Sequence, residues 1–320
     1  MILIISNKWD IAVDFVVLEL RRRGHKFTRL NAEDLPTLRA TIAFPKAAIS
    51  IDGFRSNLAL DRDVKVVWNR RPGYPFDDYL VSEKPSSAVQ KFVSDQWHIW
   101  RDALTIVPNI TWINDPQAEW RAENKVRQLM WAQTIGFAVP KTLVTNDPAA
   151  IREFQSSCDG KIIAKALYAP LIEEPEFDTF IFTNALPVLS PDDDPSIRLC
   201  PMIVQELIAE KTEYRVTVIG GRLLIARIVS DTGIPVDLDW RTQKQGLRFV
   251  ACNIPQSIEE MCISYVKQCG LLFGAIDLVE SHGQFYFLEI NPNGEWGWLQ
   301  KQAGLPIAEH LCDLFIASDK

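Results

Sequence analysis

The stretch FLEINPNGEW, residues 287–296, places two oxygen-bearing side chains at the end of an apolar run. Glu289 and Asn291 are two residues apart, and residues two apart on a β-strand point to the same face. Asp277 lies in the preceding apolar run and could join them across a hairpin. Oxygen ligands without histidine or cysteine suit a hard cation, so these three residues are candidate ligands for Mg²⁺.

The turn of this hairpin predicts its register. If residues 281–283 form a three-residue loop with glycine in the left-handed conformation, Asp277 pairs with Phe287. This register puts Asp277, Glu289 and Asn291 on one face. It puts four apolar residues on the other face: Ile276, Leu278, Leu288 and Ile290. The alternative is that Asp277 is an exposed strand residue and that Glu289 caps the next loop.

Charged and polar residues elsewhere in the chain are of the types that a magnesium–phosphate site needs. Magnesium held by a few carboxylates takes part of its shell from phosphates, and the same phosphates need cationic side chains. The candidates are Lys125, Lys165, Gln205, Glu206, Glu213, Arg215 and Arg241. Structural alternatives are a solvated lysine at Lys125 and a strand-end cap at Glu206. Lys165 lies in an apolar strand, where an unpaired lysine is costly.

The elements that position these residues follow from the sequence pattern. Residues 2–31 predict a β-α-β unit; further strands near 47–51 and 64–69 and a helix near 86–104 complete an α/β lobe. It lacks a Gly-x-Gly-x-x-Gly dinucleotide fingerprint. A third helix ends at Gly136. Residues 214–230 predict a hairpin with a two-residue turn at 220–221, which pairs Arg215 with Ala226 and sends Arg227 to the other face.

The composition is that of a globular protein, with 320 residues of which 47% are hydrophobic and 23% charged. A net charge of −7 gives no general attraction to nucleic acid or to an anionic membrane. The six cysteines lack Cys-x-x-Cys spacing, which favours reduced thiols. The first apolar run has no basic leader, and no run reaches the roughly 18 residues of a membrane span. We therefore expect a cytoplasmic protein that binds neither nucleic acid nor membrane.

Over nearly its whole length the chain resembles the ATP-grasp superfamily. The resemblance is carried by NKVRQLMWAQTIGFAVPKT, IIAKAL, VQELIAEKTEYRVTVIG, GAIDLVE and FLEINPNGEW, in the family's order. The motifs VVWNRRP, DWR and NPNGEWGW resemble those of the maturases of graspetides, the microviridin-type macrocyclic peptides. The resemblance implies an α/β (α+β) ATP-grasp fold that grips ATP between two sheets. It implies an N-terminal α/β domain at 1–113, a central lobe at 114–204 and a C-terminal lobe with the metal site at 205–320.

The resemblance also implies roles for individual residues. Lys125 and Lys165 match the lysines that reach the ATP phosphates, and Glu213 matches the acceptor of the ribose hydroxyls. The hinge whose backbone contacts the adenine edge matches Gln205, Glu206, Leu207 and Ile208. The ligands of two Mg²⁺ ions match Asp277, Glu289 and Asn291. The cations beside the transferred phosphoryl group match Lys165, Arg215 and Arg241.

The implied reaction converts an Asp or Glu side chain of a precursor peptide into an acyl phosphate, which a Ser or Thr hydroxyl or a Lys amine then attacks. The residues leave the choice between ester and amide open. One alternative is a ligase that joins an amino acid to a small substrate or protein tail. Another is a nucleotide-binding relative without activity, against which the intact metal trio argues.

Two segments depart from the general pattern. KALYAPLI lacks the glycine-rich phosphate loop of many ATP-grasp enzymes, a lack that the peptide maturases share. Glu295 and Gly297 in GEWGW differ from the residues usual in the maturases, and this difference concerns substrate contacts.

The partner that the resemblance implies is a precursor peptide with a leader and an acidic, hydroxyl-rich core. The acidic run Asp192, Asp193 and Asp194 is a candidate site for a basic leader residue, and the alternative is a solvated turn between two prolines. Arg70 and Arg71 are candidate contacts for the acidic core, and the alternative is structural ion pairing between lobes. A homodimer is a further expectation.

Overall fold

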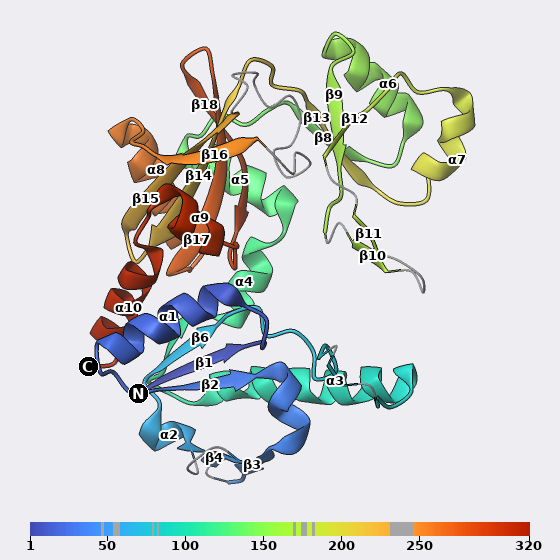
Figure 1. The fold of residues 1–320 in the computed structure, drawn as a ribbon. Coiled ribbons are helices and arrows are strands. Elements are labelled where there is room, and N and C mark those ends of the chain that lie inside the picture. Colours follow the sequence, from blue (N-terminus) through green and yellow to red (C-terminus); the bar gives the residue numbers. More distant parts are fainter. Residues whose placement is uncertain are drawn as a thin grey trace.

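The structure is a computed structural model. It describes residues 1–45, 48–53, 58–78, 80–81, 83–168, 171–173, 178–180, 183–230 and 246–320. Three main sheets organise these residues, and Figure 1 shows a parallel sheet at the bottom with two antiparallel sheets above it. This arrangement confirms the expected mixed α/β architecture.

The N-terminal lobe is built on a parallel sheet with strand order β2-β1-β6-β7. Its strands are β1 (Ile2–Ser6), β2 (Phe27–Asn31), β6 (Val66–Asn69) and β7 (Thr111–Ile113). A small antiparallel sheet comprises β3 (Arg39–Ala43), β4 (Ala48–Asp52) and β5 (Leu58–Ala59). The helices of this part are α1 (Ile11–Arg22), α2 (Leu60–Asp63) and α3 (Ser87–Asp102), with 3-10 turns η1 (Ala32–Thr37) and η2 (Ala103–Ile106). The predicted β-α-β opening is confirmed.

The central part carries a smaller antiparallel sheet with strand order β12-β9-β13-β8. Its strands are β8 (Thr142–Thr145), β9 (Ile162–Lys165), β12 (Asn184–Ala185) and β13 (Met202–Glu206), and β10 (Leu171–Glu173) pairs with β11 (Asp178–Phe180). The helical elements are α4 (Pro116–Ala122), α5 (Lys125–Ile135), α6 (Pro148–Ser157), η3 (Pro191–Asp193) and α7 (Asp194–Ile197). β13 extends two residues past the expected boundary at 204/205, and the division into three domains stays a prediction.

The C-terminal part carries a five-stranded antiparallel sheet with strand order β16-β15-β14-β17-β18. Its strands are β14 (Thr212–Ile219), β15 (Arg222–Ser230), β16 (Leu247–Ala251), β17 (Phe273–Ser281) and β18 (Gln284–Asn291), and its helices are α8 (Gln256–Gln268), α9 (Gly297–Ala303) and α10 (Ile307–Ser318). The turn between β14 and β15 has the predicted two residues, and Arg215 pairs with Ala226 as expected.

The two faces of the five-stranded sheet differ in what covers them. One face packs against α5 and α8 through a core that includes Val216, Ile276, Phe287 and Tyr265. Along β14 the alternate residues Glu213 and Arg215 belong to the other face, because side chains alternate along a strand. That face therefore carries charged side chains next to the smaller sheet.

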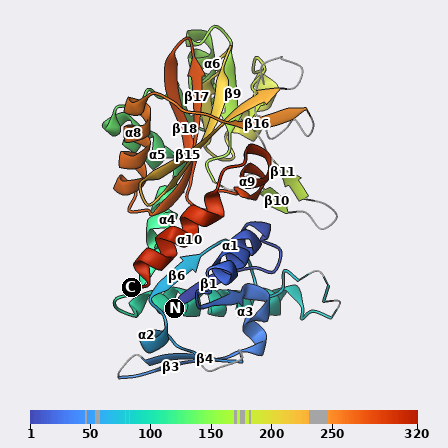
Figure 2. The ribbon, with the colours of Figure 1, turned by 60° about the vertical axis from the view of Figure 1, so that its left-hand side comes forward.

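The C-terminal helices fasten this sheet to the N-terminal lobe (Figure 2). α1 and α10 pack together in a buried cluster that also includes Trp68 of β6, whose ring lies 5.3 Å from that of Phe315. An ion pair of 2.7 Å between Arg23 and Asp313 joins the same two helices. None of the described helices combines the length and apolar character that a bilayer crossing needs.

Candidate active site

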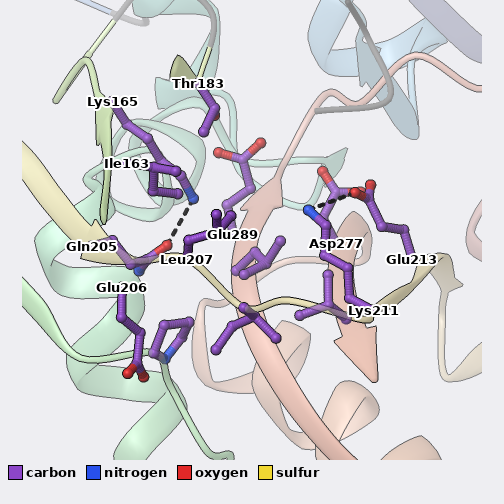
Figure 3. A pocket seen from close by; sticks show the side chains of 14 residues that line it. Ile163, Lys165, Thr183, Gln205, Glu206, Leu207, Lys211, Glu213, Asp277 and Glu289 are labelled. Carbon is purple, nitrogen blue, oxygen red and sulfur yellow. Dashed lines mark hydrogen bonds and ion pairs between the residues drawn. The ribbon is translucent and has the colours of Figure 1, made fainter. Parts of the chain in front are cut away.

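A pocket opens between the small central sheet and the charged face of the five-stranded sheet (Figure 3). The side chains that line it come from β9, β13, β14, β17, β18, the segments between them and the residues just before β8. They are Pro140, Ile163, Lys165, Thr183, Gln205, Glu206, Leu207, Ile208, Lys211, Glu213, Asp277, Val279, Leu288 and Glu289. Eight of these residues are among the candidates that the sequence supplies.

Lys165 lies at the end of β9, and its ammonium group points into the pocket (Figure 3). Its Nζ donates a hydrogen bond of 2.9 Å to Oε1 of Gln205 on the neighbouring strand β13. Gln205 in turn donates to Oγ1 of Thr142 at 2.9 Å. This hydrogen bond positions the ammonium group of Lys165 at the wall of the pocket.

The hinge segment that leaves β13 is tied to neighbouring strands through its backbone. The N–H of Glu206 donates to the carbonyl of Lys141, and the N–H of Leu207 donates to the carbonyl of Lys161, both at 2.9 Å. The Glu206 carboxylate accepts from the N–H of Lys141 at 2.7 Å. Glu206 thus caps the end of the strand, which is the structural alternative considered for it. Leu207 and Ile208 line the pocket.

Glu213 forms an ion pair with Lys211, a residue that the sequence analysis did not single out. Lys211 Nζ lies 2.8 Å from Oε1 of Glu213, and the two side chains are 8% and 10% exposed. The signal that could have found Lys211 is its period-two spacing with Glu213 and Arg215, because residues at i, i+2 and i+4 share one face of a strand. Thr183 and Leu288 are further lining residues that were missed as site residues.

Asp277 and Glu289 face each other across β17 and β18, which differs from the predicted register. The expected pairing of Asp277 with Phe287 is wrong because His282 as well as Gly283 adopts a left-handed conformation, with φ of 50° and 81°. The turn therefore has two residues instead of three, and its shape matches the twist of the strands.

A bulge next to Asp277 completes the correction of the register. Leu278 pairs with Phe287, and Asp277 pairs with Glu289, so Leu288 is the extra residue between these pairs. Leu288 lines the pocket beside Glu289, whereas it was expected on the apolar face. Phe287 lies in the core instead of opposite Asp277.

The three candidate metal ligands lie together, and each of the two carboxylates contacts a cation. Arg215 Nη1 lies 2.7 Å from Asp277 Oδ1, with both side chains largely buried. Lys125, the first residue of α5, places Nζ 3.4 Å from Glu289 Oε2. Asn291 places its amide 3.5 Å from Asp277 Oδ2. Two carboxylates and an amide form a hard-oxygen donor set, which fits Mg²⁺ whose remaining positions are filled by phosphate or water.

Gly294 allows the loop after β18 to approach this cluster. A Cβ at position 294 would lie 2.5 Å from Cβ of Ala275 and 2.8 Å from Nη2 of Arg215. Any side chain there would therefore displace the guanidinium that contacts Asp277.

Arg70 connects the same loop to the N-terminal lobe. Its side chain is 1% exposed and forms ion pairs with Asp10 at 3.1 Å and with Glu295 at 2.8 Å. Its Nη1 also donates to the carbonyl oxygens of Asn293 and Gly294. Arg70 therefore makes the ion pairs between lobes that were considered as the alternative to a substrate contact. Arg71 is 53% exposed and lies 3.0 Å from Glu295, so its guanidinium is accessible to a substrate.

The acidic run lies on η3 and at the start of α7, within the central part. Asp193 accepts a hydrogen bond from the N–H of Ser190, and Asp194 forms an ion pair with Arg152. The Asp192 side chain is exposed. A docking role for these residues stays a prediction. Arg241 and the rest of the DWR motif lie outside the described residues.

The fold matches solved ATP-grasp structures. A RiPP-associated ATP-grasp ligase from Chryseobacterium gregarium, solved in complex with ADP and a leader and core peptide, has a TM-score of 0.85 at 26% identity, over 100% of this chain and 98% of that one. The macrocyclase MdnC from Microcystis aeruginosa, bound with precursor peptide MdnA, has a TM-score of 0.84 at 22% identity, over 99% of both chains.

At the level of sequence, 79 residues are 30% identical to the tetrahydromethanopterin:alpha-L-glutamate ligase of Methanocaldococcus jannaschii. The match spans 24% of this chain and 27% of that ligase, so it covers about a quarter of the length of this curated relative. No protein-family model matches the chain.

The two facing sheets and the charged pocket between them define an ATP-grasp protein. Over its whole length the chain has the ATP-grasp fold and is similar to ATP-grasp ligases. Among these, it resembles the graspetide-type ligases that act on ribosomally made peptides.

Proposed function

We propose that the chain is an ATP-dependent ligase that closes rings in a ribosomally made precursor peptide. An Asp or Glu side chain of the peptide takes the γ-phosphoryl group of ATP and becomes an acyl phosphate, with ADP released. A Ser or Thr hydroxyl or a Lys amine of the same peptide then attacks the acyl carbon and expels phosphate. The observation that carries the proposal is the pocket in which Lys165 and the cation-paired carboxylates Asp277 and Glu289 meet.

The pocket residues support a division of labour along the nucleotide. The apolar hinge residues Leu207 and Ile208 suit an adenine ring, and because the N–H groups of Glu206 and Leu207 are already bonded, an adenine edge would use hinge carbonyls and the Ile208 N–H. Glu213 would accept the ribose hydroxyls, with its carboxylate oriented by Lys211. Lys165 would contact the phosphates.

Asp277, Glu289 and Asn291 would hold Mg²⁺, and we propose two ions by resemblance to the family. When bound, magnesium neutralises charge on the phosphates as the phosphoryl group moves. Arg215 and Lys125 contact the same carboxylates and would turn towards the phosphate oxygens when a nucleotide enters. We propose that Arg241 contacts the transferred phosphoryl group, and this role is based only on the resemblance to the family.

Further parts of the proposal concern partners. Arg71 would contact the acidic core of the peptide, and the run of aspartates at 192–194 would pair with a basic leader residue. We also propose a homodimer and a cytoplasmic location.

The 79-residue match to a glutamate ligase favours a second candidate function, in which the chain joins a free amino acid to a small substrate or protein tail. Both functions share the acyl-phosphate intermediate and differ in the nucleophile.

Mass spectrometry separates the two functions. A candidate precursor peptide with a core rich in Ser, Thr, Asp and Glu is incubated with the protein, ATP and MgCl₂. Ring closure lowers the peptide mass by about 18 Da per ring, the mass of one water per condensation. Addition of an amino acid raises the peptide mass instead. An unchanged peptide mass, in a sample in which the protein hydrolyses ATP, would refute macrocyclisation. Glu289→Gln should abolish the reaction, whereas Glu260→Gln on the exposed side of α8 should leave it unchanged.

A further inference from the structure

A second cavity, which the proposed nucleotide site does not use, lies between α3 and α4 and has a volume of about 480 Å³. Its lining includes Asn69, His98, Arg101, Asp102, Glu119 and Trp120. Asn69 is the last residue of β6, so the cavity lies at the carboxyl end of a parallel strand. Open α/β sheets bind ligands at this edge, and the volume is within the range of small-ligand sites. We call it the α3/α4 cavity.

The α3/α4 cavity adjoins the candidate active site. Glu123 lines the cavity, and two residues later Lys125 contacts Glu289 of the metal cluster. Two residues span at most about 7 Å of chain. On another side, the ring of Trp120 makes an edge contact of 5.9 Å with Tyr168, which follows Lys165 by three residues. An extended peptide could therefore occupy both sites at once.

Arg101 supplies a positive charge inside the cavity. In the part of the chain that the structure describes, its guanidinium makes no ion pair with a carboxylate, and its Nη2 lies 3.3 Å from Nδ1 of His98. Burial lowers the pKa of Arg101, while Tyr74, Glu119 and Asp102 act on it only through longer-range electrostatics. An arginine stays protonated under such conditions, so desolvation raises its attraction for an incoming anion.

Glu119 does not cancel this charge at neutral pH. Its side chain is buried and accepts a hydrogen bond of 2.9 Å from Nδ2 of Asn69. Burial raises the pKa of Glu119 to about 8, more than hydrogen bonds from Asn69 and Asn293 lower it. The protonated carboxyl can donate a hydrogen bond, so it is compatible with an anion at Arg101.

We propose that the α3/α4 cavity binds the carboxylate of an acidic side chain of the peptide substrate, with Arg101 as its ion-pair partner and the exposed ring of Trp120 against the neighbouring peptide. Because the occupant is a residue of the peptide substrate, this assignment rests on the proposed function. A carboxylate fits better than a phosphate, because the lining residues Asp102 and Glu123 offset the charges of Arg101 and Arg121 and leave no excess positive charge for a dianion. The acidic residue bound in the α3/α4 cavity would differ from the acidic residue that receives the phosphoryl group. Its binding would fix the position of the peptide relative to the nucleotide pocket.

The test measures binding without turnover. Acetyl-Gly-Glu-Glu-Gly-amide and its Gln-Gln counterpart are titrated into the full chain in the absence of ATP, by calorimetry. We expect the wild-type protein to bind the Glu peptide at least tenfold more tightly, since a charge-assisted hydrogen bond contributes about that factor. Arg101→Gln should remove the preference, and Arg101→Lys should retain part of it. Arg62→Gln, exposed on α2, is the matched control and should retain all of it.

Equal affinity of the wild-type protein for both peptides would overturn the assignment, as would a preference that survives Arg101→Gln. ADP binding is measured on each variant to show that the fold and the nucleotide pocket are intact. Failure of this inference differs from failure of the proposed function. If the wild-type protein closes rings but shows no preference for the Glu peptide, only the α3/α4 assignment is refuted. If the wild-type protein shows the preference but closes no rings, only the macrocyclase proposal is refuted.

Discussion

Arg215 offers the sharpest test of the carboxylate cluster, through the substitution Arg215→Met. The guanidinium lies 2.7 Å from Asp277, and the two side chains are 7% and 11% exposed. Methionine keeps most of the volume but removes the charge. Asp277 then loses its buried counter-ion while it faces Glu289, whose Cβ is about 5 Å away in a cross-strand pair.

We expect Arg215→Met to lose much of its stability, because the ion pair between Arg215 and Asp277 is buried. Breaking a buried ion pair by removing one partner costs about 3–5 kcal/mol in the free energy of unfolding. The matched control is Arg222→Met in the same sheet, whose ion pair with Asp313 has side chains 60% and 42% exposed. An exposed pair contributes at most about 1 kcal/mol, so the control should remain within that range of wild type.

Magnesium should reverse part of this loss. In the wild-type protein without nucleotide, Arg215 and Lys125 already contact the two carboxylates, so added MgCl₂ should change stability little. In Arg215→Met, a divalent ion can take the place of the missing guanidinium and stabilise the folded state. The double variant Arg215→Met/Asp277→Leu should be more stable than Arg215→Met without magnesium, because it no longer buries an aspartate that has lost its guanidinium partner.

The assay is urea unfolding followed by tryptophan fluorescence, with and without MgCl₂, for wild type, Arg215→Met, Arg222→Met and the double variant. The reasoning is refuted if Arg215→Met unfolds within about 1 kcal/mol of wild type, below the range for a broken buried pair. It is equally refuted if MgCl₂ shifts the wild-type protein and Arg215→Met by the same amount.

Two further outcomes follow from buried charges. The pKa of Glu119 is about 8 against an ordinary 4.5, so the folded state holds a proton that the unfolded state releases, and stability falls as pH rises from about 5 to 8. Glu119→Gln should remove this loss of stability and should be more stable than wild type at pH 8 by on the order of 4 kcal/mol. Thermal unfolding at a series of pH values tests this, and the same pH dependence of stability in both proteins would contradict it. Lys211→Met should weaken ADP binding about tenfold in calorimetry, because Glu213 loses the ion-pair partner that lies 2.8 Å away. Lys267→Met on α8 is the control. Equal ADP affinities of wild type and Lys211→Met would show that Lys211 does not support the site.

Sequence patterns predicted the elements of the site better than the pairing between them. The helix that ends at Gly136, the strand that carries Lys165 and the two-residue turn before β15 are all present as expected. These features depend on local signals such as caps, apolar periodicity and glycine pairs. The hairpin after Asp277 was placed wrongly, because the segment Ser-His-Gly fits either a two-residue or a three-residue turn until the strand twist selects one.

The contacts that sequence could not supply are tertiary. The pattern could not determine whether Arg70 faces a substrate or another lobe, because Asp10 and Glu295 are distant in sequence and reach it only in the folded chain. The period-two spacing of Lys211 with Glu213 was visible, yet the burial that makes the pair functional depends on how the two sheets face each other. The cavity at Arg101 has no motif, because α3 and α4 form it only by packing.

The contacts of Arg70 limit which hybrid proteins can work. Its guanidinium contacts Asp10 in the N-terminal lobe and Glu295 in the loop after β18, so the two regions must match at these three positions. Exchanging residues 1–113 for those of a relative without an arginine at position 70 would leave the carboxylate of Glu295 without this buried partner. Chimeras that aim to transfer peptide selectivity should therefore move the 293–296 loop together with the N-terminal lobe.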